Sequence, residues 1–479
     1  MMRNLQPMDE LYNHDAMALA ELVSKGEMTA GELLEVVINR IEKLNPKLNA
    51  IEQMNIELAR EKARQGLPDG PFKGVPSFIK ANIDFPGFST TYCSRGFADT
   101  PAITYTSPLA ERYIEAGLNI IGKSTLPEFA YNTHTESKLS GLTRNPWNPS
   151  LTVGGSSGGA AALVASGIVP MAHGTDGGGS CRIPSSHCHT VSLKTSRGRH
   201  VDVGRVPPII ETQTSQMLTR SVRDLAMSFM VTERRGDNAS LPELGFISGP
   251  SSKRLKIAVG LKTADGQSAD ADVLDVIMQT AERCKLMGHE VVELDCLPYH
   301  VEDFLDQFMA LISVLTGRFA GQFKETFGRP VADGDFEKMQ MYFLDAMPDD
   351  PEAEWNRLME TAGKISDSFD RLFESYDLIL TPTVPVVAKD AAERSIDKDP
   401  ISQLAGGRCD IRFMAVANTT GHPAITVPAG FNPDGLPVGA QFIAAKGAED
   451  TLFSIAYELE DELKWSRHWA PISVAFAGS

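Results

Sequence analysis

Short apolar runs alternate along this chain with longer segments of helical periodicity. In residues 109–116 and 269–287, apolar positions recur every three or four residues, which predicts helices. The short apolar runs predict buried strands at 75–79, 118–121, 255–259, 291–294, 378–380 and 424–427. Strands that alternate with helices are typical of an α/β fold, here a mixed sheet with helices on both faces.

Two further helices are predicted from local signals. Thr29 and Glu32 have the spacing of a capping box before an apolar stripe, and that helix is expected to end at Asn45 and Pro46. The apolar, alanine-rich residues 160–171 predict a second helix between two glycine-rich clusters.

Residues 299–376 differ in character from the rest of the chain. They are rich in phenylalanine and methionine at helical spacing, and residues 348–351 (Pro-Asp-Asp-Pro) interrupt them. Because such side chains adapt to irregular apolar ligands, this region is a candidate lid or substrate-pocket wall, in which Met341 and Tyr342 would select the substrate. An ordinary helical core is the alternative.

Each glycine-rich cluster contains a serine: Ser156 lies in residues 154–159 and Ser180 in residues 174–180. Glycine lets the backbone approach a ligand closely and turn successive N–H groups toward one point, so such clusters can hold a developing oxyanion. Flexible connectors or tight turns are the alternative. Neither cluster has the dinucleotide fingerprint or the Gly-Lys-Ser/Thr ending of a P-loop, so nucleotide binding is not predicted.

A serine nucleophile needs a base, and the sequence offers two kinds. His173, His187 and His189 follow the first cluster, but no Gly-x-Ser-x-Gly elbow accompanies them. Lys80 ends a predicted buried strand, where burial would lower its pKa and leave a neutral amine. A lysine at a solvated strand end is the alternative.

Read together and in order, residues 74–83, 155–159 and 174–184 resemble the amidase signature family, and further matching segments extend the likeness over nearly the whole chain. The resemblance implies a three-layer α/β/α fold with a large mixed sheet, and amide hydrolysis by a Ser-Ser-Lys triad. Ser180 would be the nucleophile, Ser156 the bridging serine beside a cis peptide bond, and Lys80 the base. No cofactor or metal is implied.

The resemblance also assigns supporting roles around the triad. The oxyanion would be received by the N–H groups of Gly177, Gly178, Gly179 and Ser180. A supporting set would hold the loop through charge-assisted hydrogen bonds, namely Ser157, Thr175, Asp176 and Arg182. One domain over 1–479 is expected, with N-terminal helices in 1–70, the signature core in 71–235, the lid or pocket region in 299–376 and the rest of the core in 377–479.

The chain departs from the family pattern at the site. Ala81 stands where the family has Asp after the lysine, and Cys181 replaces an aliphatic residue after the nucleophile. The first change removes a carboxylate close to the amine, and the second alters the floor of the site.

Composition narrows the partners and the setting. The formal charge of −17 and pI near 5.1 argue against nucleic acid and anionic membranes as partners and favour a small neutral or cationic substrate. No apolar run of membrane-spanning length and no signal-peptide pattern in residues 1–15 is seen, and the six cysteines form no Cys-x-x-Cys pair. A cytoplasmic monomer or homodimer without metal is expected.

The leading functional hypothesis is an amidohydrolase for a small hydrophobic amide, an anilide or an oligoamide. The carboxy-terminal half is similar to 6-aminohexanoate cyclic-dimer hydrolases and aryl acylamidases. Cleavage of a carbamate by the same triad is a close variant. The glutaminase subunit of a tRNA-dependent amidotransferase and a non-catalytic binding protein are the other hypotheses.

Overall fold

The computed structural model of the chain describes residues 8–201 and 212–477, so the first seven residues of the N-terminal stretch considered above lie outside it. Its strands are β1 Ile51–Met54, β2 Pro76–Lys80, β3 Asn119–Ser124, β4 Glu136–Ser137, β5 Gly141–Leu142, β6 Met171–Asp176, β7 Ser192–Lys194, β8 Thr214–Thr219, β9 Lys256–Val259, β10 Glu290–Glu293, β11 Leu378–Pro382, β12 Ala424–Phe431 and β13 Pro437–Ala444. The six predicted strands are all present, and their ends differ from the predicted ones by at most four residues.

The helices fill the intervals between these strands. They are α1 Ala16–Ser24, α2 Ala30–Leu48, α3 Ile56–Gln65, α4 Pro108–Glu115, α5 Gly158–Ala165, α6 Arg182–Cys188, α7 Val222–Thr232, α8 Ala271–Leu286, α9 Val301–Phe327, α10 Lys338–Asp345, α11 Pro351–Phe373, α12 Pro400–Ile411, α13 Ala415–Thr420 and α14 Glu449–Leu463. None of these helices, within the described residues, is both long and apolar enough to cross a lipid bilayer.

The strands of the described residues form four hydrogen-bonded groups, of which the largest is a six-stranded mixed sheet and the smallest include the short pair β4-β5. Six of them pair in the order β10-β9-β11-β13-β12-β7, with β10, β9 and β11 parallel and the others antiparallel. A bridge between Val191 and Thr219 joins this sheet to the antiparallel pair β8-β6. Ser77 Oγ in β2 donates to the Met171 carbonyl in β6 at 2.9 Å, which brings in the third group, β2-β3-β1. The predicted α/β/α class is confirmed.

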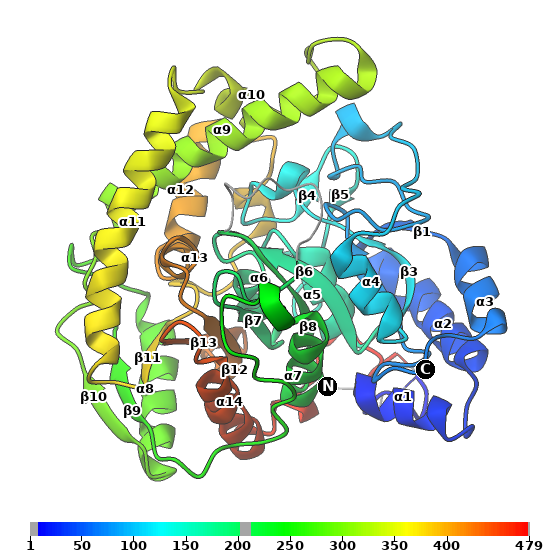
Figure 1. Cartoon of the computed structure of the whole chain (residues 1–479), viewed down its shortest axis with the longest axis horizontal. Coiled ribbons are helices and arrows are strands. Elements are labelled where there is room, and N and C mark those ends of the chain that lie inside the picture. The colour runs from blue at the N-terminus through cyan, green and yellow to red at the C-terminus, as the bar shows by residue number, and fades with distance from the viewer. Residues whose placement is uncertain (1–7, 202–211, 478–479) are drawn as a thin grey trace.

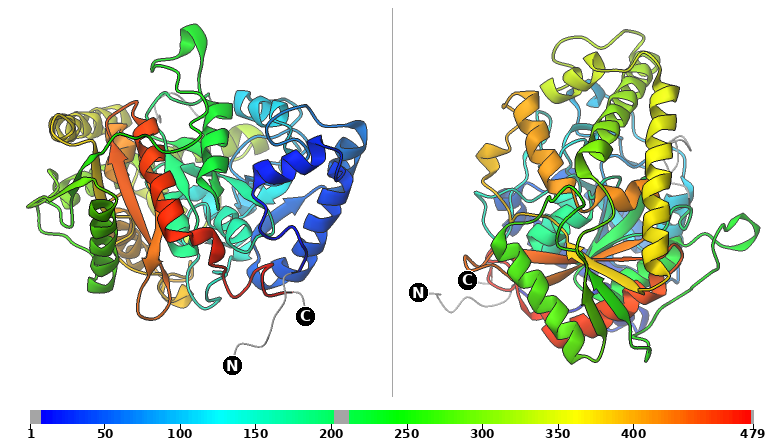
Figure 2. Two further views of the ribbon diagram at one scale, coloured as in Figure 1. Left: turned by 90° about the horizontal axis from the view of Figure 1, so that it is seen from below. Right: turned by 90° about the vertical axis from the view of Figure 1, so that its left-hand side faces the viewer.

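Helices cover both faces of the six-stranded sheet. Alternate residues of a strand point to opposite faces, so Ile257 and Val259 pack with α7, α8 and α14, whereas Ala258 packs with α9, α11 and α13. Figure 2 shows this sheet between its two helical layers. The buried layers hold the loops at the strand ends in fixed positions.

Two predicted helices have different ends in the structure. The helix after the first glycine cluster is only Gly158–Ala165, because Gly167 adopts a φ of 74° and the chain then enters β6 at Met171. Helix α2 has the predicted capping box but continues past Pro46 to Leu48. Proline in a last turn removes one backbone donor and still permits the turn to close.

The region at 299–376 is helical, as predicted, and forms α9, α10 and α11. Figure 1 shows α9 and α10 above the sheet and α11 along its left side. Phe304 and Phe308 of α9 and Leu358 of α11 pack with Ile379 of the sheet, so these two helices belong to the core, while α9 and α10 line the cavity described below. Both interpretations of the sequence therefore apply to α9, whereas α11 is a core helix and α10 a cavity-wall helix.

Candidate active site

A cavity of about 520 Å³ opens where the segment after β2, the end of β6 and the glycine-rich loops face helices α9, α10 and α12. Its floor includes Ser156, Ser180, Gly177 and Gly178, and Thr175 lies at its edge. The volume falls in the range typical of small-molecule sites, and most of the exposed wall is apolar. Residues from the two glycine clusters, 24 positions apart in the sequence, thus share one concave surface.

Lys80 is the last residue of β2 and is completely buried. Its Nζ lies 2.7 Å from Ser156 Oγ, 2.8 Å from Ser157 Oγ and 3.0 Å from Thr175 Oγ1. Burial lowers the pKa of this amine to about 8, although the nearby Cys181 and Asp176 oppose the shift. The predicted buried lysine is therefore observed, and with this pKa about a tenth of it is neutral at pH 7 and about half at pH 8.

The neighbours of Lys80 determine how a neutral amine is oriented. Ser157 Oγ donates to the Thr175 carbonyl at 3.1 Å, so it accepts from Lys80. Thr175 Oγ1 accepts from Asn82 Nδ2 at 3.2 Å and also lies within hydrogen-bond distance of Lys80. With its two N–H groups directed to Ser157 and Thr175, the neutral amine is left with a lone pair for the Ser156 hydroxyl.

The two serine loops are joined directly. The peptide bond between Gly155 and Ser156 is cis, as the resemblance implies, and the Ser157 N–H donates to the Ser180 carbonyl at 3.0 Å. Gly155 has no room for a side chain, because a Cβ there would lie 2.8 Å from the Asn132 carbonyl oxygen. The close approach of these backbones places both hydroxyl-bearing residues at the cavity floor.

The four proposed oxyanion donors are not equivalent. The Gly179 N–H donates to Asp176 Oδ1 at 2.8 Å, which removes it from the set available to a ligand. The N–H groups of Gly177, Gly178 and Ser180 make no hydrogen bond to another described residue. Gly179 has a φ of 120°, a conformation that favours glycine, so its role is to turn the loop. The prediction is corrected accordingly, to Gly177, Gly178 and Ser180.

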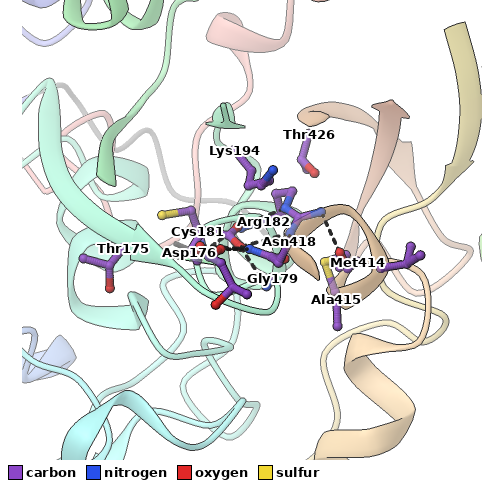
Figure 3. Close-up of polar contacts among 12 residues, drawn as sticks. Thr175, Asp176, Gly179, Cys181, Arg182, Lys194, Met414, Ala415, Asn418 and Thr426 are labelled. Atoms are coloured by element: carbon purple, nitrogen blue, oxygen red, sulfur yellow. Dashed lines mark hydrogen bonds and ion pairs between the residues drawn. The ribbon is translucent and has the colours of Figure 1, made fainter. Parts of the chain in front are cut away.

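Asp176 and Arg182 form a buried ion pair beneath this loop (Figure 3). Arg182 Nε and Nη2 each donate to Asp176 at 2.9 Å, and Asn418 of α13 donates to the same carboxylate at 3.0 Å. Burial by itself would raise the pKa of Asp176, but the Arg182 charge and these hydrogen bonds outweigh it and hold the pKa below its usual value. The loop is therefore tied to a permanent carboxylate.

The histidines considered as alternative bases lie elsewhere. None of His173, His187 and His189 lines the cavity that contains the two serines. His173 Nδ1 accepts from the Lys80 backbone N–H at 3.4 Å, and burial, followed by the Lys80 charge, lowers its pKa to about 3. The geometry supports lysine as the base. No cluster of metal-ligating side chains occurs among the residues that the structure describes.

Sequence reasoning missed two contributors to the site. Asn418, in the short helix α13, stabilises Asp176 from a distant part of the chain. Tyr131 lines the cavity as well. No sequence spacing connects Asn418 or Tyr131 to the serines, so only the fold could reveal them. Phe308 of α9, which lies in the predicted pocket-wall region, packs over the loop of oxyanion donors, since a Cβ on Gly178 would lie 2.8 Å from its ring.

The candidate specificity residues on α10 were chosen wrongly. Met341 and Tyr342 do not line the cavity, and Tyr342 is exposed. Met339 and Phe343 line it instead. They are four residues apart and therefore lie on one face of the helix, whereas 341 and 342 point away from it.

Comparison with known proteins agrees with this geometry. The Amidase family model matches residues 32–453. A Mycobacterium bovis protein named "Putative amidase AmiC" is 33% identical over 97% of this chain and 97% of its own length. A solved structure of 6-aminohexanoate cyclic dimer hydrolase with substrate has a TM-score of 0.89 at 29% identity, covering 97% of this chain and all of that one.

A second solved structure, a bacterial aryl acylamidase of the amidase signature family, has a TM-score of 0.87 at 26% identity and covers 98% of this chain and 99% of its own. The match of the family model extends over most of the sequence and includes every residue of the site built above. The chain therefore belongs to the amidase family and is a hydrolase that acts on the C–N bond of amides.

Proposed function

We propose that this enzyme hydrolyses small hydrophobic amides through a serine acyl-enzyme, with Ser180 as nucleophile, Ser156 as proton relay and Lys80 as base. The observation that carries the proposal is the 2.7 Å contact between the buried Lys80 amine and Ser156, on a cavity floor that also holds Ser180. A lysine with a pKa of about 8 can act as a general base near neutral pH.

The reaction begins when neutral Lys80 takes the Ser156 hydroxyl proton while Ser156 takes that of Ser180. The Ser180 oxygen attacks the carbonyl carbon, and the N–H groups of Gly177, Gly178 and Ser180 receive the oxyanion. When the C–N bond breaks, the proton returns from Lys80 through Ser156 to the departing nitrogen. Water, deprotonated by the same relay, then attacks the acyl-enzyme and releases the acid with regeneration of Ser180.

Ser157, Thr175, Asp176 and Arg182 act through other groups in this scheme. Ser157 and Thr175 accept the N–H groups of the neutral amine and leave its lone pair for Ser156. The ion pair of Asp176 with Arg182 fixes the loop that presents Ser180. These four are positioning residues.

The wall of the cavity supports a hydrophobic substrate. Phe308, Phe319 and Phe343 line it together with aliphatic side chains of α9. Aromatic walls bury apolar surface of a ligand and favour flat or extended groups, such as an anilide or an oligoamide. A urethane carbonyl fits the same nucleophile and donors, so aryl carbamates belong in the substrate panel.

Labelling by a fluorophosphonate and hydrolysis of p-nitroanilides, linear amides and aryl carbamates test the proposal. Ser180→Ala should abolish labelling and reduce hydrolysis about a thousandfold or more, because the covalent route is lost. Ser252→Ala, an exposed serine outside the cavity, is the matched control and should behave as the wild-type enzyme does. Labelling that persists in Ser180→Ala would refute the assignment.

A further inference from the structure

The cavity contains a positively charged side chain that has no partner among residues 8–201 and 212–477. Arg318 of α9 lines the wall, and its guanidinium group makes no hydrogen bond or ion pair with any described residue. Its Nη1 atom is buried and unsatisfied. A guanidinium nitrogen shielded from water without an acceptor is unfavourable, so this group is suited to an anionic or strongly polar ligand.

The other charged groups at the wall of the cavity differ from Arg318. Arg408 is already neutralised by ion pairs with Asp306 and Glu302. Asp84 accepts a hydrogen bond from Tyr105. Glu325 lies two turns further along α9, is exposed, and forms no ion pair with Arg318. Arg318 is therefore available to a ligand.

Tyr131 provides a second polar group beside Arg318. It lines the same cavity, and its ring packs against Phe319, the residue next to Arg318. Burial raises the pKa of Tyr131, and the positive charge of Arg318 opposes this shift only in part, so the phenol stays protonated. A phenol that stays protonated can donate to the same ligand oxygen atoms as an arginine.

Helix α9 sets the distance between Arg318 and the oxyanion donors. Phe308 packs against Gly178, one of the proposed oxyanion donors, and Arg318 follows Phe308 by ten positions on the same helix. A rise of 1.5 Å per residue separates their Cα atoms by about 15 Å, and the Arg318 side chain leans back toward Phe308 by several ångströms. A linear chain of about six to ten atoms would therefore reach from the reacting carbonyl group to the Arg318 guanidinium.

We propose that Arg318, assisted by Tyr131, is a specificity-determining residue that binds a carboxylate at the far end of an elongated amide substrate. This inference rests on the proposed function and names its substrate class, an amide that carries a terminal carboxylate on an apolar chain. It replaces the neutral or cationic substrate expected from net charge, because the charge of the whole surface does not determine the potential inside one cavity.

Matched substrate pairs test the inference. The mono-p-nitroanilide of an eight-carbon dicarboxylic acid is compared with octanoyl p-nitroanilide, which has a methyl group in place of the carboxylate. A second pair carries the carboxylate on the amine side of an acetamide. In at least one pair, the acid should have a kcat/KM about tenfold or more above that of its neutral partner, since a charge-assisted contact is gained.

Variants then assign that preference to one side chain. Arg318→Gln should remove the advantage of the acid and leave hydrolysis of the neutral partner within about twofold, whereas Arg318→Lys should retain part of it. Arg357→Gln removes an exposed arginine of α11 outside the cavity and should change neither rate. Equal rates for acid and neutral partners in both pairs, or an advantage that survives Arg318→Gln, would overturn the inference.

Binding to Ser180→Ala separates this inference from the proposed function. Calorimetric titration with both substrate pairs should show, in at least one pair, about tenfold tighter binding of the acid than of its neutral partner, and Arg318→Gln in that background should abolish the difference. This outcome would support the carboxylate site even if the wild-type enzyme hydrolysed none of these ligands. Equal affinity of acid and neutral partner in both pairs would reject the carboxylate site while the hydrolytic proposal stood.

Discussion

At the scale of single residues, the site depends on two buried ionisable groups, Lys80 and Asp176, whose pKa values are shifted by different neighbours. Lys80 has only hydroxyl and carbonyl neighbours at its Nζ, so burial prevails and its pKa falls to about 8. Asp176 has a bidentate arginine and several N–H donors, so its charge is retained. Lys80 can therefore exchange a proton near neutral pH, whereas Asp176 cannot.

This difference predicts the pH profile. Only the neutral form of Lys80 can accept a proton, so kcat/KM should rise about tenfold per pH unit below about pH 8 and level off above it. A rate that stays flat between about pH 6 and pH 9 would contradict the assignment of Lys80 as base.

Ser157→Ala removes one hydrogen-bond acceptor of the Lys80 amine and should lower kcat more than it changes KM in steady-state kinetics.

At the scale of elements, the pocket wall is made by helices that present one face to the cavity and another to the protein or to solvent. Helix α10 is short, and Gln340 anchors it by donating to the Glu128 carbonyl at 3.1 Å. The Glu337 N–H donates to the Glu128 carboxyl group at 2.7 Å and fixes its N-terminal end. The face that carries Phe343 is thereby held against the ligand space.

Two adjacent aromatic residues of α10 offer a matched test. Phe343→Leu changes the shape of the cavity and should shift the ratio of kcat/KM for long and short acyl anilides by about threefold or more. Tyr342→Leu makes a similar change on the exposed side and should leave that ratio unchanged. Steady-state kinetics on both variants gives the ratio, and identical shifts in the two would show that α10 does not contribute selectively to the pocket.

At the scale of the whole molecule, the site is assembled from segments far apart in sequence. Lys80 comes from β2, the serines from loops beside α5 and α6, Asn418 from α13 and the outer wall from α9. Helix α5 links these parts, because Gly159 lies against the Thr125 backbone of the segment after β3. A Cβ at Gly159 would come within 2.5 Å of the Thr125 nitrogen.

Replacing a helical glycine by alanine should therefore change the free energy of unfolding in opposite directions at two positions. Gly159→Ala forces backbone atoms apart and should lower the free energy of unfolding by about 1–3 kcal/mol. Gly363→Ala, at an exposed position of α11 with no atom within 4 Å, should raise it by about 0.5–1 kcal/mol through helix propensity. Urea denaturation measures both values, and equal effects would show that the packing around α5 is not restrictive.

The local signals in the sequence determined some elements of the fold and the chemical types in the site. The apolar runs predicted six of the thirteen strands in the described residues, and the capping box predicted the start of α2. The glycine clusters and Lys80 predicted residues that come together at the cavity floor. These features follow from neighbours along the chain, where periodicity, turn chemistry and burial of a short strand have the same effect in any context.

Only the tertiary structure decided the contacts between distant segments. The use of the Gly179 N–H by Asp176, the anchoring of that carboxylate by Asn418 and the side of α10 that faces the ligand all depend on packing. The same holds for Arg318, which no motif distinguishes from other arginines until the fold places its guanidinium in the cavity without a partner among the described residues. Burial and hydrogen-bond satisfaction are properties of three-dimensional neighbours, so a one-dimensional pattern cannot specify them.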